Sequence, residues 1–227
     1  MIFIIYKSDK NGTVFTLLRK TTTIQENKME TNEQDFFEYD IVKVGEKVAN
    51  FKMAAFQNDE IKDISLSDYK GKWVVLMFYP ADFTFVCPTE LEDMAALYPK
   101  FKELGAEVIS VSTDTAFVHK AWHDTSDAIG KVEYPMGADP TGEVSQLFDV
   151  YIDKEGLALR GTFIIDPDGV LKTAEIHDLG IGRSAAEALR KLEAAKFVHE
   201  HGDQVCPANW APGGNTLTPG LDLVGKI

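Results

Sequence analysis

The sequence predicts an α/β fold organised around a parallel strand–helix–strand unit. Two apolar runs typical of buried strands, WVVLMFY (Trp73 to Tyr79) and EVISVSTD (Glu107 to Asp114), flank a segment with a different period. In that segment apolar residues recur every three or four positions, which places them on one face of a helix. These are Leu91, Met94, Leu97, Phe101 and Leu104. A helix between two buried strands implies a right-handed crossover, so we expect the two strands to be parallel.

Further elements are expected on both sides of this unit. Upstream, FKMAAF (51–56) alternates weakly and predicts a strand, and SLSDYKGK predicts a polar turn. Downstream, TAFVHKAWH predicts a short helix, and YPMGADPTGEV predicts a turn-rich connection into a helix that ends near Leu147. TFIIDPDGVLKTAEI has two strand-like runs around Asp-Pro-Asp-Gly, which predicts a β-hairpin.

The C-terminal part predicts one more helix followed by an arm. Ser184 and Glu187 fit an S-x-x-E capping box that opens a helix ending near Val198. The tail from Gly202 holds three prolines and five glycines and ends in the apolar LDLVGKI. We therefore expect an arm that docks on another surface rather than a closed domain.

Composition limits the classes of partner. The 227 residues carry a formal net charge of −13 and 44% hydrophobic residues, which is typical of a globular, soluble protein. Nucleic acids and anionic membranes are bound through basic patches, so this charge argues against both partners. No stretch approaches the roughly 18 apolar residues of a membrane span, and the start lacks the features of a signal peptide. We expect a cytoplasmic protein.

The first 28 residues differ from the rest of the sequence. They hold five basic and two acidic residues, and METNEQDFFEYD from Met29 resembles the start of a protein. We therefore expect residues 1–28 to be an extension that is disordered or an artefact of the assigned gene start. A targeting peptide is the alternative interpretation.

Only two cysteines are present, Cys87 and Cys206. Two cysteines do not make a disulfide-rich secreted scaffold, and neither has the CxxC spacing of a zinc site. We expect no metal, flavin or nucleotide cofactor, and the sequence has no glycine-rich phosphate loop. In a cytosolic protein, so few thiols suggest either catalytic use or none.

Cys87 lies where a buried strand passes into a helix, in FYPADFTFVCPTE, with Pro88 expected at the first helical position. The unpaired N–H groups and the dipole at a helix N-terminus favour a thiolate there. Thr84 can turn its hydroxyl toward the sulfur or toward a bound oxygen. Arg160, just ahead of the strand TFIID, could lie beside Cys87 on an adjacent strand and stabilise the anion.

This thiol has several alternative interpretations. A single cysteine beside an apolar strand is commonly a small buried hydrophobe. The absence of a CxxC pair argues against a thioredoxin-type dithiol, and no arginine follows Cys87 by six residues as a phosphatase loop requires. No GxSxG or paired Cys–His motif indicates acyl transfer.

The motifs resemble those of a known family. FYPADFTFVCPTE resembles the peroxiredoxin signature, and VCPANW resembles the resolving-cysteine motif of the typical two-cysteine class. STDT…HKAWH, GLALRGTFIIDPDG and TLTPGLDLVGKI resemble the alkyl hydroperoxide reductase C type in particular. The resemblance spans residue 44 to the C-terminus. It implies a thioredoxin-like fold with a central mixed sheet flanked by helices over residues 44–196, and a C-terminal arm over 197–227.

The resemblance also implies roles for the residues around the thiol. Cys87 matches the peroxidatic cysteine, and Pro80 matches the proline that shields it. Thr84 matches the threonine that hydrogen-bonds the thiolate and the peroxide, and Arg160 the arginine that orients the O–O bond. Glu90 stands where the family often has a glutamate that steadies this arginine.

Cys206 matches the resolving cysteine. The implied enzyme is a thiol-dependent peroxidase in antioxidant defence that reduces hydrogen peroxide and organic hydroperoxides through a Cys87 sulfenic acid. This sulfenic acid would condense with Cys206 of the partner subunit to an intersubunit disulfide. A flavoprotein disulfide reductase is the first expectation for the electron donor, and thioredoxin is the second. Peroxynitrite is a further candidate substrate.

Two departures from the family pattern modify these expectations. The sequence has HDLGIGRS in place of a Gly-Gly-Leu-Gly motif and stops at LVGKI without a Tyr-Phe helix, which predicts resistance to overoxidation. Assembly into a ring of five dimers is expected, although Val118 replaces a threonine that many members have at the dimer–dimer contact. Two other functions remain open: a holdase chaperone or redox relay, and a general disulfide oxidoreductase, which the missing CxxC disfavours.

Overall fold

The computed structural model describes residues 5–8, 14–17 and 41–226, in two compact units, Met1–Glu38 and Tyr39–Ile227. In the first unit, β1 (Ile5–Ser8) pairs with β2 (Val14–Leu17) in antiparallel fashion. The expectation of disorder or an artefact for residues 1–28 falls mainly on residues outside those described, so it stays a prediction.

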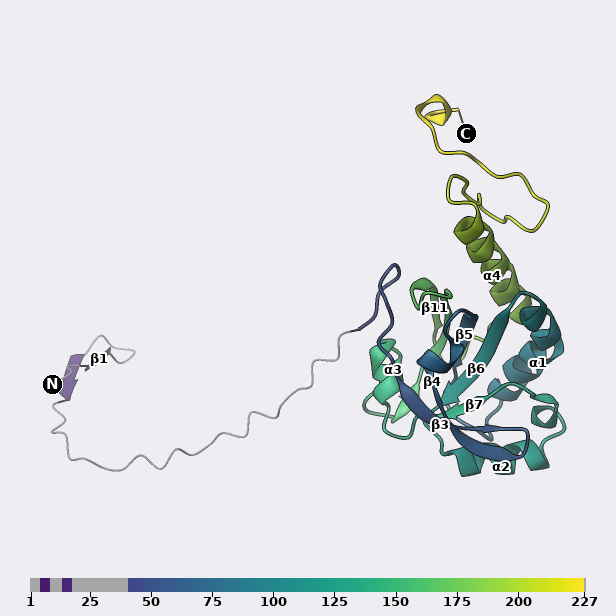
Figure 1. The fold of residues 1–227 in the computed structure, drawn as a ribbon. Coiled ribbons are helices and arrows are strands. Elements are labelled where there is room, and N and C mark those ends of the chain that lie inside the picture. The colour runs from purple at the N-terminus through teal and green to yellow at the C-terminus, as the bar shows by residue number, and fades with distance from the viewer. Residues whose placement is uncertain (1–4, 9–13, 18–40, 227) are drawn as a thin grey trace. The chain divides into compact units, whose positions relative to one another are not determined.

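The second unit is built on a seven-stranded mixed sheet with the order β11-β10-β5-β6-β7-β3-β4 (Figure 1). Its strands are β3 (Lys52–Gln57), β4 (Glu60–Ser65), β5 (Trp73–Phe78), β6 (Ala106–Ser112), β7 (Met136–Ala138), β10 (Arg160–Ile165) and β11 (Leu171–His177). The three central strands, β5, β6 and β7, run parallel, and the outer strands add antiparallel pairs on both sides. A separate small hairpin joins β8 (Tyr151–Ile152) and β9 (Leu157–Ala158).

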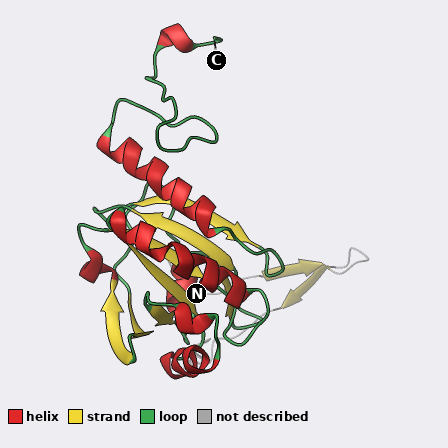
Figure 2. Ribbon diagram, turned by 90° about the vertical axis from the view of Figure 1, so that its right-hand side faces the viewer, coloured by secondary structure: helices red, strands yellow, loops and turns green. Residues whose placement is uncertain are grey.

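Helices flank the sheet, as the ribbon of Figure 2 shows. They are α1 (Cys87–Glu103), α2 (Ala116–Thr125), α3 (Glu143–Leu147) and α4 (Ala185–Glu200), with 3₁₀ turns at Leu66–Tyr69, Ile129–Lys131 and Leu221–Leu223. The core has two parts because side chains along β5 alternate between the faces. Val75 and Met77 pack with residues of α1 and α4, whereas Val74 and Leu76 pack with residues of α3. The predicted mixed sheet flanked by helices is confirmed.

The predicted crossover unit and hairpin are also confirmed: β5 and β6 are parallel with α1 between them, and β10 and β11 are antiparallel. Two strands of the seven-stranded sheet were not predicted, nor were those of the two small hairpins, β1–β2 and β8–β9. β4 is an edge strand with four of its six residues exposed, so its sequence EIKDIS shows no apolar alternation. β7 has only three residues, MGA, which is too short for a periodic signal. The segment SLSDYKGK, expected as a turn, contributes the last residue of β4 and a 3₁₀ turn.

Two helix starts differ from the prediction in detail. α1 begins at Cys87, with Val86 as its N-cap, so Pro88 takes the second helical position rather than the first. At the start of α4, Ser184 Oγ accepts from the Glu187 N–H at 3.4 Å, as expected. The Glu187 carboxylate, however, binds the Arg190 guanidinium at 2.7 and 2.8 Å instead of completing the capping box.

The arm follows α4, which continues to Glu200, beyond residue 197 where the arm was expected to begin. It extends past the C-terminal end of α4 (Figure 1). Its first part folds back on this helix: Trp210 is buried, its ring lies 5.0 Å from that of Phe197, and its carbonyl accepts from Arg190 Nη1 at 2.8 Å. Within the described ranges, no helix is long and apolar enough to cross a membrane.

Candidate active site

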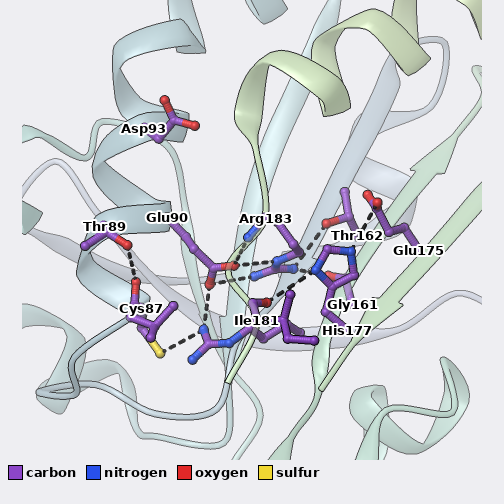
Figure 3. A network of polar contacts seen from close by, with 12 residues as sticks. Cys87, Thr89, Glu90, Asp93, Gly161, Thr162, Glu175, His177, Ile181 and Arg183 are labelled. Atoms are coloured by element: carbon purple, nitrogen blue, oxygen red, sulfur yellow. Dashed lines mark hydrogen bonds and ion pairs between the residues drawn. The ribbon is translucent and has the colours of Figure 1, made fainter. Parts of the chain in front are cut away.

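Cys87 is completely buried at the first position of α1, immediately after the loop 79–86 that leaves β5. The first N–H groups of an α-helix lack helical acceptors, and the helix dipole is positive at this end. Both effects favour a negative charge on the sulfur. The strand–loop–helix connection therefore places the thiol at an electropositive point of the fold. Figure 3 shows Cys87 at the edge of a network of polar contacts.

Arg160 lies directly opposite this sulfur. It is the first residue of β10, which pairs with β5, and its Nη1 atom donates to Cys87 Sγ at 3.4 Å. The guanidinium is held by two further contacts, since Nη1 also donates to Glu90 Oε2 at 2.6 Å and Nε donates to the Leu179 carbonyl at 2.7 Å. The structure thus brings together Cys87 and Glu90 of α1 and Arg160 of β10.

Glu90 connects two arginines. One carboxylate oxygen accepts from the Arg183 backbone N–H and Nε, both at 2.8 Å, and the other accepts from Arg183 Nη2 at 3.1 Å as well as from Arg160. Burial is the largest single influence on the pKa of Glu90 and would raise it. The contacts with Arg183 and Arg160 together outweigh burial, so the pKa lies below its usual value. Glu90 is therefore a carboxylate at neutral pH.

Arg183 is a site residue that sequence reasoning missed. It stands just before α4, and its Nη1 atom also donates to the Gly161 carbonyl at 2.7 Å and to Thr162 Oγ1 at 3.1 Å (Figure 3). Its position in GIGRSAAE carries no motif signal. Only the packing of α4 beside α1 brings it to Glu90.

The three charged side chains of this buried cluster carry a net positive charge. The side chains of Arg160 and Arg183 are each 4% exposed and that of Glu90 is 3% exposed, so two cations share one carboxylate. Buried charge is costly unless it is paired. A thiolate at Cys87 would supply the second negative charge, so the cluster favours the nucleophilic form of the cysteine.

The other two predicted residues of this region occupy the loop. Pro80 is buried immediately after Tyr79, and Thr84 is half-buried. In this structure Thr84 Oγ1 donates to the Ala81 carbonyl at 2.9 Å. A hydroxyl has one proton, so donation to a sulfur or a peroxide oxygen requires it to rotate away from Ala81.

Cys206 lies apart from this cluster. It is partly buried on the arm, its Sγ atom lies 3.9 Å from the Ala194 carbonyl, and both cysteines are free thiols. Burial raises the pKa of the Cys206 thiol, although the nearby Arg190 acts in the opposite direction. Ala194 lies ten residues beyond the N-cap Ser184, about 15 Å along α4 at the rise of an α-helix.

Comparison with known proteins decides the family. The model of the AhpC/TSA family matches residues 44–174, and that of the C-terminal domain of 1-Cys peroxiredoxin matches residues 194–223. The chain belongs to the AhpC/TSA family of peroxiredoxins. Despite the name of the second model, the segment that it matches contains Cys206.

Curated relatives and solved structures agree with this assignment. The chain is 56% identical to alkyl hydroperoxide reductase C of Bacillus subtilis over 184 residues, covering 81% of this chain and 98% of the relative. Identity to the protein of the same name from Staphylococcus epidermidis is 54% over 186 residues, with the same coverage.

The crystal structure of Enterococcus faecalis AhpC superposes with a TM-score of 0.71 at 49% identity, covering 74% of this chain and 100% of that one. Reduced Plasmodium vivax 2-Cys peroxiredoxin gives a TM-score of 0.76 at 33% identity, covering 79% and 94%. The predicted thioredoxin-like α/β fold of this peroxiredoxin is confirmed.

Proposed function

We propose that this peroxiredoxin reduces hydrogen peroxide and organic hydroperoxides with Cys87 as the attacking thiol. The contact between Arg160 Nη1 and Cys87 Sγ at 3.4 Å, inside a cluster with one unbalanced positive charge, carries the proposal. The thiolate attacks one peroxide oxygen, the O–O bond breaks, and Cys87 becomes a sulfenic acid. The departing alkoxide or hydroxide takes up a proton and leaves as alcohol or water.

The protein contributes charge stabilisation at the oxygen that departs. Arg160 is fixed by Glu90 and by the Leu179 carbonyl, so it need not reorganise as charge moves from sulfur to oxygen. Thr84, once rotated, donates to the bound peroxide, and Pro80 shields the sulfur from water. Glu90 and Arg183 position Arg160 without touching substrate.

Cys206 resolves the sulfenic acid, and the geometry of α4 favours a pairing between subunits. At its start, Arg183 binds Glu90 beside Cys87; near its end, the His199 ring lies 5.5 Å from Trp73, the first residue of β5. The helix thus runs from the Cys87 end of the sheet toward the opposite end. Cys206 contacts the later half of α4, whereas a disulfide requires Cα atoms within about 7 Å.

A homodimer is the assembly that meets this requirement, because a two-fold partner offers its own arm to each Cys87. Exposed large apolar side chains support self-association: Phe85 is 93% exposed beside the site, Leu221 is 93% exposed on the arm, and Phe117 is 76% exposed on α2. We extend the proposal to a pentamer of dimers and a cytoplasmic location. The electron donor is a flavoprotein disulfide reductase, with thioredoxin as the alternative.

The test is peroxide consumption with dithiothreitol as reductant, accompanied by non-reducing gels of the peroxide-treated protein. The intact protein should consume peroxide and give a dimer-sized band that reduction removes. Cys87→Ser should abolish both, and Cys206→Ser should abolish the band while Cys87 still consumes peroxide, because dithiothreitol can reduce its sulfenic acid directly. Undiminished turnover by Cys87→Ser, or a disulfide within one chain, would contradict the proposal.

A further inference from the structure

A second buried polar network lies beneath the loop that leads to Cys87. Tyr79, at the start of the loop, donates its hydroxyl proton to Asp82 Oδ1 at 2.6 Å. The other carboxylate oxygen of Asp82 lies 2.7 Å from Nδ1 of His119, which belongs to α2. The side chains of Asp82 and His119 are both 0% exposed, so water does not satisfy either of them.

The network fastens the loop to three other parts of the fold. Through His119 Nε2, which lies 3.0 Å from the Gly137 carbonyl, Asp82 is joined to α2 and to β7. Its backbone N–H donates to Asp114 Oδ2 at 2.8 Å, just after β6, and this oxygen also accepts from Ser112 Oγ at 2.7 Å. Asp82 is therefore held by direct contacts with residues 32 and 37 positions away in sequence.

A count of protons shows that the parts of this network depend on one another. The Gly137 carbonyl only accepts, so His119 Nε2 carries a proton. Asp82 Oδ1 is occupied by the proton of Tyr79, whose pKa is raised well above its usual value by burial and then by Asp82, so the hydroxyl remains a donor. A further proton lies between Asp82 Oδ2 and His119 Nδ1, because two bare acceptors would repel each other at 2.7 Å. Removal of either partner leaves the other buried without its hydrogen bond.

The backbone next to Asp82 is strained. Phe83 has a φ of +54°, in the left-handed region that bulky residues seldom adopt. Its side chain is 57% exposed, and its ring centroid lies 5.8 Å from that of Trp122 on α2. Such a conformation persists only where the surrounding structure holds it. The contacts of Asp82 fix the chain immediately before the strained residue, four positions ahead of Cys87.

We propose that Asp82 and His119 are positioning residues for the peroxide step, and that their buried pair holds the loop in the conformation that keeps Cys87 opposite Arg160. This inference rests on the proposed function. The two chemical steps have opposite requirements for the loop. Attack on peroxide needs the loop in place, whereas disulfide formation needs Cys87, which is completely buried, to leave this position and meet a second sulfur. Weakening the pair therefore slows attack and does not slow disulfide formation.

The experiment is stopped-flow Trp fluorescence after mixing the reduced protein with peroxide. The first phase, whose rate is proportional to the peroxide concentration, reports attack. The second phase, whose rate is independent of that concentration, reports disulfide formation. His119→Met keeps a similar volume but removes both ring hydrogen bonds; we expect the first phase to slow at least about tenfold. The second phase should be unchanged or faster.

Asp82→Asn is the conservative control. Its amide can donate to Nδ1 of a neutral His119 while its oxygen accepts from Tyr79, so the geometry survives without the shared proton. We expect both phases to stay within about threefold of the unsubstituted protein, since no buried group loses its partner. Tyr79→Phe removes only the 2.6 Å hydrogen bond and should slow the first phase alone, which provides a readout if His119→Met does not fold.

Three results would overturn the inference. The first is an unchanged first phase in folded His119→Met or in Tyr79→Phe, even with a lower melting temperature, since the pair would then serve stability only. The second is a first phase that is as slow in Asp82→Asn as in His119→Met. The third is an equal slowing of both phases in His119→Met or Tyr79→Phe. Absence of both phases in the unsubstituted protein would instead refute the proposed function.

Discussion

Arg183 and Glu90 are joined by three hydrogen bonds, from the Arg183 backbone N–H and Nε at 2.8 Å and from Nη2 at 3.1 Å. The same carboxylate accepts from Arg160 at 2.6 Å. A single buried anion thus fixes the geometry of both arginines, and through Arg160 it fixes the charge that faces Cys87.

Glu90→Gln is expected to damage both stability and the reaction. The new amide places a donor against one of the guanidiniums and leaves two buried cations without a carboxylate, so the free energy of unfolding should fall by about 3 kcal/mol. The matched control is Glu92→Gln on the same helix, where Glu92 is half-exposed and pairs with Lys131, with an expected loss below about 1 kcal/mol. Urea unfolding measures both. Equal losses in the two variants would contradict this account.

Stability should depend on pH through Glu90. Because its folded-state pKa is lowered, its contribution is present above the ordinary value of 4.5 and is lost as the pH falls through the folded value. Urea unfolding from neutral pH to below 4.5 should show a steeper decline for the unsubstituted protein than for Glu90→Gln. Other carboxylates titrate in both proteins, so the difference reports Glu90. Parallel curves would show that the arginines do not stabilise this carboxylate.

The Cys206 thiol should react slowly with alkylating agents at neutral pH. Its pKa is raised by burial, so little thiolate is present until the pH exceeds the ordinary value of 9.0. Iodoacetamide labelling of Cys87→Ser across a pH series measures this, and the same variant unfolded in urea is the control. The midpoint should lie higher in the folded protein. Coincident midpoints would mean that the arm does not cover Cys206.

Overoxidation should be rare during turnover. The segment HDLGIGRS departs from the Gly-Gly-Leu-Gly motif of the family members that are prone to overoxidation. After turnover with dithiothreitol at low peroxide, mass spectrometry should find Cys87 as thiol or disulfide. Sulfinic acid at Cys87 should appear only at high peroxide and more readily in Cys206→Ser, which cannot form the disulfide. Sulfinic acid at Cys87 of the unsubstituted protein at low peroxide would contradict the predicted resistance to overoxidation.

The sequence was informative wherever local patterns coincide with burial. β5, α1 and β6 follow from apolar periodicity, and the position of Cys87 at a helix start follows from the change of period after the first strand. Arg160 could be placed because a strand beside β5 was expected. These inferences need only neighbours in the chain and one pairing of strands.

The remainder depended on contacts that no local pattern encodes. Arg183 meets Glu90 across 93 residues, and Asp82 meets His119 across 37, so each pair exists only after helices have packed on the sheet. β4 escaped detection because an exposed edge strand needs no apolar alternation. The Glu187 side chain does not complete the predicted capping box because it accepts two hydrogen bonds from Arg190.

The most direct test of the central claim, that Arg160 activates and orients Cys87, is the rate constant for peroxide attack in Arg160→Lys. Lysine keeps the charge but cannot reach Cys87, Glu90 and the Leu179 carbonyl together. Stopped-flow fluorescence should show that this rate constant falls about a hundredfold in Arg160→Lys. The control is Arg190→Lys, on α4 away from the site, whose rate constant should be close to that of the unsubstituted protein. A rate in Arg160→Lys equal to that of the unsubstituted protein would contradict the account.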